Sequence, residues 1–298
     1  MSQGIALNSR TDTPRTVAKV LRHQGCVLLR DALPRQPLLF AGEAVHDNAQ
    51  QLTRLIGREV NNDLPLCFSD RHSADPTFVG FNGRSLTSFT DPLAVSGFDR
   101  SWFYGGERNY RRWFWENGAS FPNLVLGLVL RSALPRVYRF LYGEPTVCFY
   151  AHCAVRYQRA DIREQSYFFH QDGSYQSRDI RSHTGLTTWI PLVDCGVDAP
   201  GLELYPHALD EVLPVPSGTK GPYLFCDEKT VLERFGDRLW APSMRVGDVL
   251  IFDHTVVHRT HITTDMRRER QSADFRIFPA SGIPDYVRQD SGWFFELP

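Results

Sequence analysis

The feature that most constrains the fold of this chain is a change to β-strand patterning at Thr146. From there on, short runs of β-branched and aromatic residues alternate with turns that contain Gly and Pro. About seven strands at such short intervals are typical of a sandwich or barrel. The sequence therefore predicts a mainly β fold with flanking helices (α+β), a jelly roll with helices outside it. The expected strands are residues 147–158, 186–193, 202–205, 223–226, 249–252, 256–262 and 273–278.

The part that precedes this β region is predicted to be helical and rich in loops. Thr13 and Pro14 are typical of a helix start, and Gly25 is typical of its end. No repeat, low-complexity tract or Gly/Ser-rich linker divides the 298 residues. We therefore expect one domain over 1–298, with a helical and loop part at 1–145 and a jelly-roll core at 146–280. Other expected elements are a buried strand at 26–29, a helix at 38–56, loops at 60–120, and one or two helices at 124–142, broken near Pro135.

The composition argues against several classes of protein. A net charge of −1 lacks the basic excess of a nucleic-acid binder. The longest apolar stretch, residues 124–130, is much shorter than the ~20 residues that span a bilayer, and the N-terminus does not resemble a signal peptide. Six scattered cysteines without a CxxC pair favour reduced thiols in the cytoplasm. We expect a cytoplasmic protein that acts on a small molecule, without membrane insertion. Because only three of the 33 basic residues are lysines, the coding bias of a GC-rich bacterial genome is indicated.

A metal site is predicted by His170-Gln171-Asp172 together with the later His258. In an extended segment the side chains of His170 and Asp172 point to the same side, and Gln171 faces away. This short motif is weak alone, but the turn signal at 247–248 begins a strand–turn–strand unit that carries His258 toward the pair. Two imidazoles and one carboxylate hold Fe(II) on one face and leave the opposite face open for chemistry.

Two other histidines compete with His258 for the third ligand position. His254 lies at the expected bend, where solvent exposure or a hydrogen-bonding role is expected. His261 is an odd number of residues from His258, so on a strand it points the other way. We expect surface or core positions for the remaining histidines considered, which are His23, His46, His72, His152, His183 and His207.

An anion-binding arginine is predicted at Arg270, twelve residues after His258. Its planar guanidinium offers paired donors that fit a carboxylate. Arg270 shares a strand face with Ser272, which favours it over the neighbouring arginines. Those alternatives are Arg267, Arg268 and Arg276, of which the first two are expected in a solvated turn.

Four segments resemble the phytanoyl-CoA dioxygenase (PhyH)-like family, and the match covers roughly residues 145 to 280. They are residues 169–175, 186–192, 201–207 and 247–260, followed by Arg270-Gln271-Ser272. The resemblance implies a cupin-like double-stranded β-helix that uses Fe(II), 2-oxoglutarate (2OG) and O2. It assigns the metal to His170, Asp172 and His258, the far carboxylate of 2OG to Arg270 with the hydroxyl of Thr260, and a position near 2OG to Trp189.

The sequence departs from the family pattern at two places. The arginine comes one residue later than the commonest spacing, and Pro206-His207 lacks the usual Gly-Ser between them. Asp172 is present where halogenating variants have a ligand vacancy, which disfavours halogenation, and hydroxylation is the expected reaction. The expected substrate is a small metabolite, such as an amino acid or a biosynthetic intermediate, with succinate and CO2 as co-products.

Residues that contact the cofactor or substrate are predicted less sharply. Gln158 is assigned to the cofactor pocket, and the 60–120 loops, Tyr150, Arg156 and Tyr175 are candidates for the substrate pocket. The run at 108–112 could bind an anion, although a charge run is more often a solvated helix face. Two other functions stay open: a cupin-like metal enzyme that does not use 2OG, and a catalytically inactive binding protein.

Overall fold

The computed structural model describes residues 6–56, 62–63, 78–79, 85–86, 121–149, 154–161, 168–173, 184–216, 225–283 and 294–297. The predicted substrate contacts at Tyr150, Tyr175 and 108–112 lie outside these residues. Of the 60–120 region, the structure describes three short strands, β3 (Asn62–Asp63), β4 (Phe78–Val79) and β5 (Ser85–Leu86). None of the helices in the described ranges combines the length and apolarity needed to cross a membrane.

The larger of the two core sheets contains the N-terminal strands as well as most of the later ones. Its order is β1-β2-β10-β8-β12-β6-β13, and β7 pairs with β12 beside β6. The β1–β2 pair is parallel, and the other described pairs of this sheet are antiparallel. The strands are β1 (Ala6–Asn8), β2 (Cys26–Arg30), β6 (Thr146–Phe149), β7 (Ala154–Gln158), β8 (Leu186–Pro191), β10 (Val249–Asp253), β12 (Arg270–Pro279) and β13 (Phe294–Glu296), together with β3, which pairs with β7.

A smaller sheet faces the larger one. It consists of β9 (Gly201–Leu204) and β11 (His258–His261), which pair antiparallel. Isolated bridges widen it, because His170 pairs with both His258 and Phe225. Side chains from both sheets, among them Leu28, Leu250, Leu202 and Leu204, share one buried cluster between them. The predicted α+β class with a double-stranded β-helix core is confirmed.

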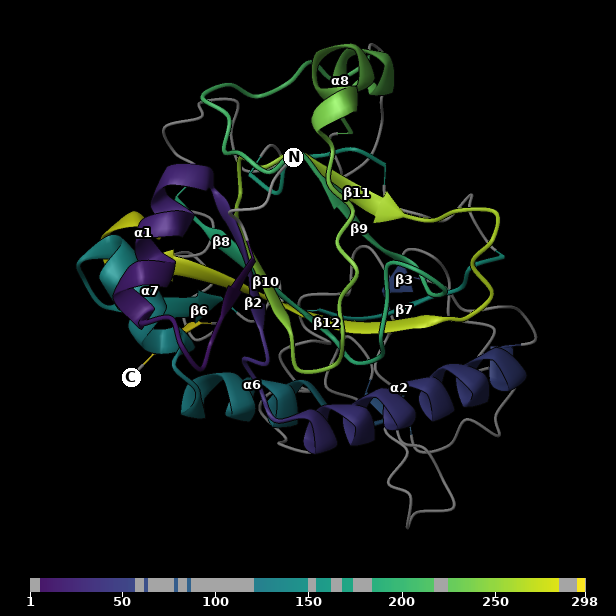
Figure 1. Cartoon of the computed structure of the whole chain (residues 1–298). Helices are drawn as coiled ribbons and strands as arrows, with labels where there is room; N and C mark the ends of the chain where they lie inside the picture. Colours follow the sequence, from purple (N-terminus) through teal and green to yellow (C-terminus); the bar gives the residue numbers. More distant parts are fainter. Residues whose placement is uncertain are drawn as a thin grey trace.

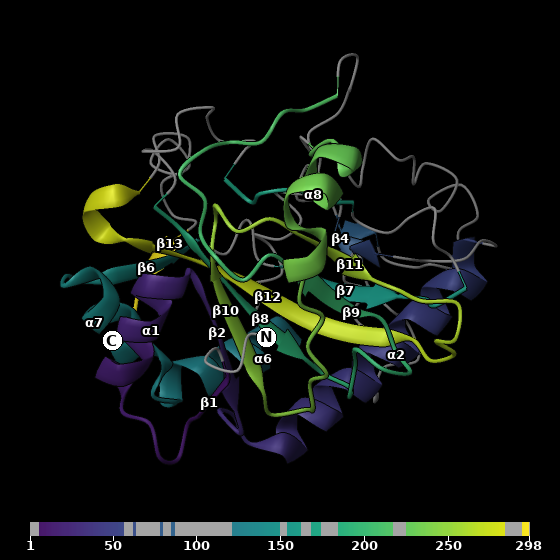
Figure 2. The same ribbon diagram turned by 45° about the horizontal axis from the view of Figure 1, so that its top comes forward.

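Helices cover the outer face of the larger sheet, opposite the β9–β11 pair (Figure 1). They are α1 (Pro14–Gln24), α2 (Arg35–Ile56), α6 (Phe121–Arg131) and α7 (Leu134–Tyr142). Their apolar side chains form one core with this face of the sheet, including Leu21, Val45, Val129 and Val137 from the helices and Leu29, Ile190, Phe275 and Ile277 from the strands. The short helix α8 (Glu228–Phe235) lies on the side of the smaller sheet (Figure 2).

The first helix has the ends that the sequence predicts. The Thr13 hydroxyl accepts a hydrogen bond from the Thr16 backbone N–H, and Pro14 occupies the first turn. Gly25 ends the helix with φ of 78°, which favours glycine, and a Cβ at this position would lie 2.3 Å from the Ala208 nitrogen. This close approach explains why the chain has glycine here.

One expected boundary is confirmed, and one expected strand is divided in two. The helix break predicted near Pro135 lies at residues 132–133, and Pro135 is in the first turn of α7, where its missing N–H is tolerated. The single strand expected at 147–158 is two strands, β6 and β7, which pair with different parts of β12.

Three further differences concern elements that carry little sequence signal. In the predicted strand at 223–226, Phe225 forms only an isolated bridge, and residues 223–224 lie outside the described part. The strands β1 and β13 and the helix α8 were not predicted. Helix α8 has a recognisable start, because the Asp227 carboxylate accepts a hydrogen bond of 2.9 Å from the Thr230 N–H.

The side chains of β12 point alternately to the two faces of the larger sheet, and four of the polar ones share one face. Its odd-numbered residues, including Phe275 and Ile277, pack in the core beneath the helices. Its even-numbered residues project to the opposite face, toward the smaller sheet. That face carries four buried polar side chains, which are Arg270, Ser272, Asp274 and Arg276. Of these side chains, Arg276 and Asp274 belong to an ion-pair network at Asp172, and Arg270 contacts the Gly201 carbonyl.

Candidate metal centre

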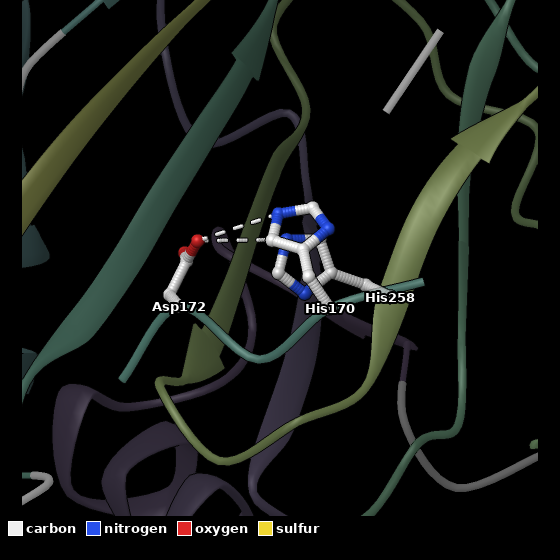
Figure 3. A group of neighbouring side chains, drawn as sticks. All are labelled: His170, Asp172 and His258. Atoms are coloured by element: carbon white, nitrogen blue, oxygen red, sulfur yellow. Dashed lines mark ion pairs between the residues drawn. The ribbon is translucent and has the colours of Figure 1, made fainter. Parts of the chain in front are cut away.

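His170 and His258 are paired directly across the smaller sheet. The His170 N–H donates to the His258 carbonyl at 2.9 Å, and the His258 N–H donates back to the His170 carbonyl at 3.0 Å. Directly opposed residues share a face, so the two imidazoles lie together, with ring centroids 4.1 Å apart. Figure 3 shows both rings and the Asp172 carboxylate pointing toward one another.

The three side chains are close enough to share one ion. The Asp172 Oδ1 atom lies 3.7 Å from His170 Nε2 and 3.8 Å from His258 Nε2. One ligand atom from each residue fits within 4.8 Å of the others, and within the described residues this is the group of His, Cys, Asp or Glu side chains that could hold a metal. Ligands about 2 Å from a first-row metal ion stand roughly 3 Å apart, so small movements would complete coordination.

Backbone carbonyls fix the tautomer of both imidazoles. His170 Nδ1 lies 2.7 Å from the Phe168 carbonyl oxygen, and His258 Nδ1 lies 3.1 Å from that of Val256. A carbonyl oxygen only accepts, so each Nδ1 carries the proton and donates. Each Nε2 then presents a lone pair on the Asp172 side. An outer hydrogen bond of this kind orients a histidine for metal ligation.

The Asp172 carboxylate is held from behind by the larger sheet. Thr187 donates its hydroxyl hydrogen to Oδ2, and Arg276 Nη2 lies 3.3 Å from both carboxylate oxygens. Thr187 and Arg276 are opposite each other in the β8–β12 register. A buried chain of ion pairs continues outward, from Arg276 to Asp274 at 2.9 Å and from Asp274 to Arg156 at 2.6 Å. The carboxylate therefore has a fixed orientation before any metal arrives.

Burial sets the protonation states that metal binding requires. Burial and the neighbouring His258 lower the pKa of His170 to about 3, and burial also lowers the pKa of His258. Burial alone would raise the pKa of Asp172, but Arg276 and the two histidines oppose it and hold this pKa well below its usual range. At neutral pH the site thus contains two neutral imidazoles and one carboxylate, ready to bind a cation without losing protons.

The metal-free protein is expected to lose stability as the pH falls below about 6.5. The unfolded chain protonates His170 near pH 6.5, whereas the folded chain does so near pH 3. Between these values the unfolded state binds more protons, so the contribution of the neutral ring is complete above 6.5 and declines on acidification. For each extra proton that the unfolded state binds, the free energy of unfolding falls by about 1.4 kcal/mol per unit decrease in pH. Urea unfolding at about pH 7 and about pH 5 measures this, and equal stabilities would contradict it.

Gln171 faces away from the triad, as predicted, and anchors the segment that carries it. Its Nε2 donates to the carbonyls of Glu211 and Thr255, both at 2.9 Å, and its Oε1 accepts from the Leu213 N–H at 2.9 Å. The side chain is fully buried. It therefore joins the His170–Asp172 segment to two loops, one of which leads into β11 and His258.

Replacing Gln171 with leucine is expected to lower the free energy of unfolding by about 2–3 kcal/mol, because buried polar groups lose their partners. The same substitution at the exposed Gln36 is the matched control and should change stability by less than about 0.5 kcal/mol. Chemical denaturation of both variants makes the comparison. A Gln171→Leu variant as stable as the parent would show that the anchor is dispensable.

The structure places Arg270 inside the barrel, close to other predicted cofactor residues. Its side chain is buried, its Nη1 donates to the Gly201 carbonyl at 3.1 Å, and its guanidinium carbon lies 5.7 Å from the Trp189 ring centroid. Gln158 is directly opposite Arg270 in the β7–β12 register. Thr260 is buried on β11, two residues after His258 and on the same face.

The competing residues have other positions. His254 is fully buried against Gly185 and Phe278, so the expectation of solvent exposure is wrong, and it is not in the triad. His261 projects toward Glu203 on the other face of β11. Arg267 and Arg268 are exposed, as predicted for a solvated turn. Arg276 is the alternative that sequence reasoning set aside, and it contacts the Asp172 carboxylate rather than an open cavity.

Sequence reasoning missed Thr187 and Asp274, which orient the triad from the larger sheet. A signal for Asp274 was present, since polar residues at every second position of a strand indicate a face with partners. Thr187 offered no comparable signal, because a threonine in a strand is ordinary.

No known protein-family model matches the sequence, and no curated protein sequence matches it either. Solved structures are similar in fold. EctD from S. alaskensis in its apo form has a TM-score of 0.53 at 16% identity, over 91% of this chain and 80% of that chain. EctD with bound Fe gives 0.51 at 14%, over 91% and 79%. SnoK, a non-heme alpha ketoglutarate dependent carbocyclase from nogalamycin biosynthesis, gives 0.50 at 14%, over 93% and 88%.

Proposed function

We propose that this chain is an Fe(II)- and 2OG-dependent dioxygenase of the PhyH-like kind that hydroxylates a small-molecule metabolite. The observation that carries the proposal is the buried, preorganised triad of His170, Asp172 and His258. A set of two imidazoles and one carboxylate suits Fe(II) and leaves coordination positions for a chelating co-substrate and O2. That residues 1–298 form one such domain, and that it is cytoplasmic, stay predictions.

The fit of 2OG rests on the polar residues on the inner face of β12 and on β11. Arg270 would hold the far carboxylate with its fork of donors, assisted by the Thr260 hydroxyl. The Ser272 hydroxyl is buried on the same face as Arg270 and has no hydrogen-bond partner within the described residues, so it is available to a ligand. Trp189 and Gln158 lie next to the guanidinium and would enclose the same end of 2OG.

When bound, iron and 2OG would supply the activation of O2, the oxidant: one oxygen atom would end in the succinate formed as 2OG loses CO2, and the other would enter a substrate C–H bond. The residues of this chain fix the positions and the protonation states of the three metal-binding side chains. Thr187 and Arg276 hold the carboxylate of Asp172, and the carbonyls behind His170 and His258 hold the two imidazoles. Burial keeps these imidazoles neutral.

Anaerobic titration of the iron-loaded protein with 2OG tests the proposal. Chelation of Fe(II) by 2OG is expected to give a weak visible charge-transfer band that saturates with added 2OG. A cupin-like metal enzyme that does not use 2OG would bind iron without developing this band. An inactive binding protein would bind its ligand unchanged after loss of the metal. A succinate-release screen over amino acids, acyl-CoAs and natural-product precursors then searches for the substrate.

A further inference from the structure

Two phenylalanines lie beside the triad, on the side of His170 away from His258. Phe225 is bridged to His170 in antiparallel fashion, and His170 is bridged to His258, so the three residues form one row across the strands. The rings of Phe225 and His170 meet edge to face, with centroids 6.2 Å apart. Phe168 packs against Phe225 in the same manner at 5.6 Å. We refer to Phe168 and Phe225 as the aromatic shelf.

The outer member of the shelf, Phe168, is exposed, and Phe225 beneath it is partly buried. The side chain of Phe168 is 50% exposed, whereas its neighbour Phe169 is 1% exposed and packs against Arg259 at 4.2 Å. Within the described residues, the other large apolar side chains with high exposure belong to elements that carry no triad residue, namely α2 (Phe40), α7 (Phe140), α8 (Leu232) and a loop (Val197). Exposed apolar surface next to a reactive centre marks a place where a ligand is bound.

The opposite side of the centre has a different chemistry. There the larger sheet presents Arg276, Asp274 and Arg156, which are bound to one another in buried ion pairs. Polar anchoring of Asp172 thus comes from one side, and apolar surface lies on the other. A ligand that covers the shelf gains from apolar burial and from ring-to-ring contact, and aromatic pairs add to the gain from area alone.

We infer that the aromatic shelf binds a flat, apolar ring of the substrate and holds it next to the metal. This inference rests on the proposed function and narrows its substrate class from small metabolites in general to ring-bearing, largely apolar ones. The reacting C–H bond would then belong to the ring or to its substituent. Phe168 acts as a specificity-determining residue, while its carbonyl, which any residue at this position would supply, orients His170.

Two probes of the same skeleton test the inference: planar naphthalene-2-methanol and its saturated counterpart, decahydronaphthalene-2-methanol. The planar probe is followed by its own fluorescence, which needs no catalysis, and the saturated probe by competition with it. We expect the planar probe to bind the Fe(II)–2OG protein about 3- to 10-fold more tightly than the saturated one. The Phe168→Ala and Phe168→Leu variants should lose this difference, because leucine keeps apolar area but has no ring. Phe140→Ala, 45% exposed on α7, is the matched control and should keep it.

The outcomes separate this inference from the function on which it rests. Equal binding of both probes, no binding of the planar probe, or an unchanged preference in Phe168→Ala would each overturn the shelf, provided that the 2OG band forms. Absence of the 2OG band in the parent protein would overturn the proposed function and the inference with it. Thermal unfolding of each variant checks that a lost preference does not reflect a lost fold.

Discussion

The Asp172→Ala and His170→Ala variants are expected to lose substrate-dependent succinate formation completely. Each substitution removes one of three protein ligands, which weakens Fe(II) binding and removes the ligand geometry that the proposed hydroxylation requires. Asp172→Ala also removes one carboxylate partner of Arg276 and leaves that of Asp274. Because breaking a buried ion pair costs about 3–5 kcal/mol and Asp274 remains, we expect a loss of stability at or below the lower end of this range.

Two measurements separate loss of metal from loss of fold. Equilibrium dialysis of Fe(II) should show an affinity at least about 100-fold lower for both variants, consistent with the loss of a metal ligand. Thermal unfolding of the metal-free proteins should show a clear defect for Asp172→Ala and a smaller one for His170→Ala. The exposed residues His23 and Asp210 give matched alanine controls, which should retain iron and activity. Full activity in either triad variant would refute the ligand assignment.

The strands of the core could be predicted because their patterns are local. Alternating or continuous apolar residues bounded by Gly and Pro marked β8, β9 and β10 to within two residues at each end. The start of β12 was harder, since Arg270, Gln271 and Ser272 are polar and yet buried. Burial of polar residues depends on partners from other strands, and a local pattern does not contain them. Helix α8 was missed because only Val231 and Phe235 are buried on it, too few for a clear helical period.

The candidate site, like the fold, could be predicted only where its geometry follows from local sequence patterns. The strand period placed His170 and Asp172 on one side, and parity separated His258 from His261 on β11. The support from the larger sheet could not be predicted in this way. Contact of Thr187 and Arg276 with one carboxylate depends on the register of β8 against β12, strands that are far apart in the sequence. A shift of one residue would turn both side chains to the other face.

The Arg270→Leu variant is expected to bind 2OG about 100-fold more weakly while it still binds Fe(II). A charge-assisted, two-point contact in a buried site is worth about 3 kcal/mol, which corresponds to this change in the dissociation constant. Arg270 is buried and near Trp189, so solvent does little to weaken the contact. Arg270→Lys keeps the charge and loses the planar fork, and we expect an intermediate loss of about 10-fold. The anaerobic charge-transfer band, titrated with 2OG, gives both constants.

Arg268→Leu is the matched control for this series, because Arg268 lies two residues earlier and is exposed. It should leave the 2OG dissociation constant within about twofold of the parent, since an exposed charge is largely screened. If Arg268→Leu weakened 2OG binding and Arg270→Leu did not, the anchor would be in the turn and the register of β12 would not set the co-substrate site. If neither did, the inner face of β12 would hold no diacid, and the triad would have to serve a metal enzyme of another kind. The order of the 2OG dissociation constants of the three variants therefore tests whether the polar face of β12 binds the far carboxylate of 2OG.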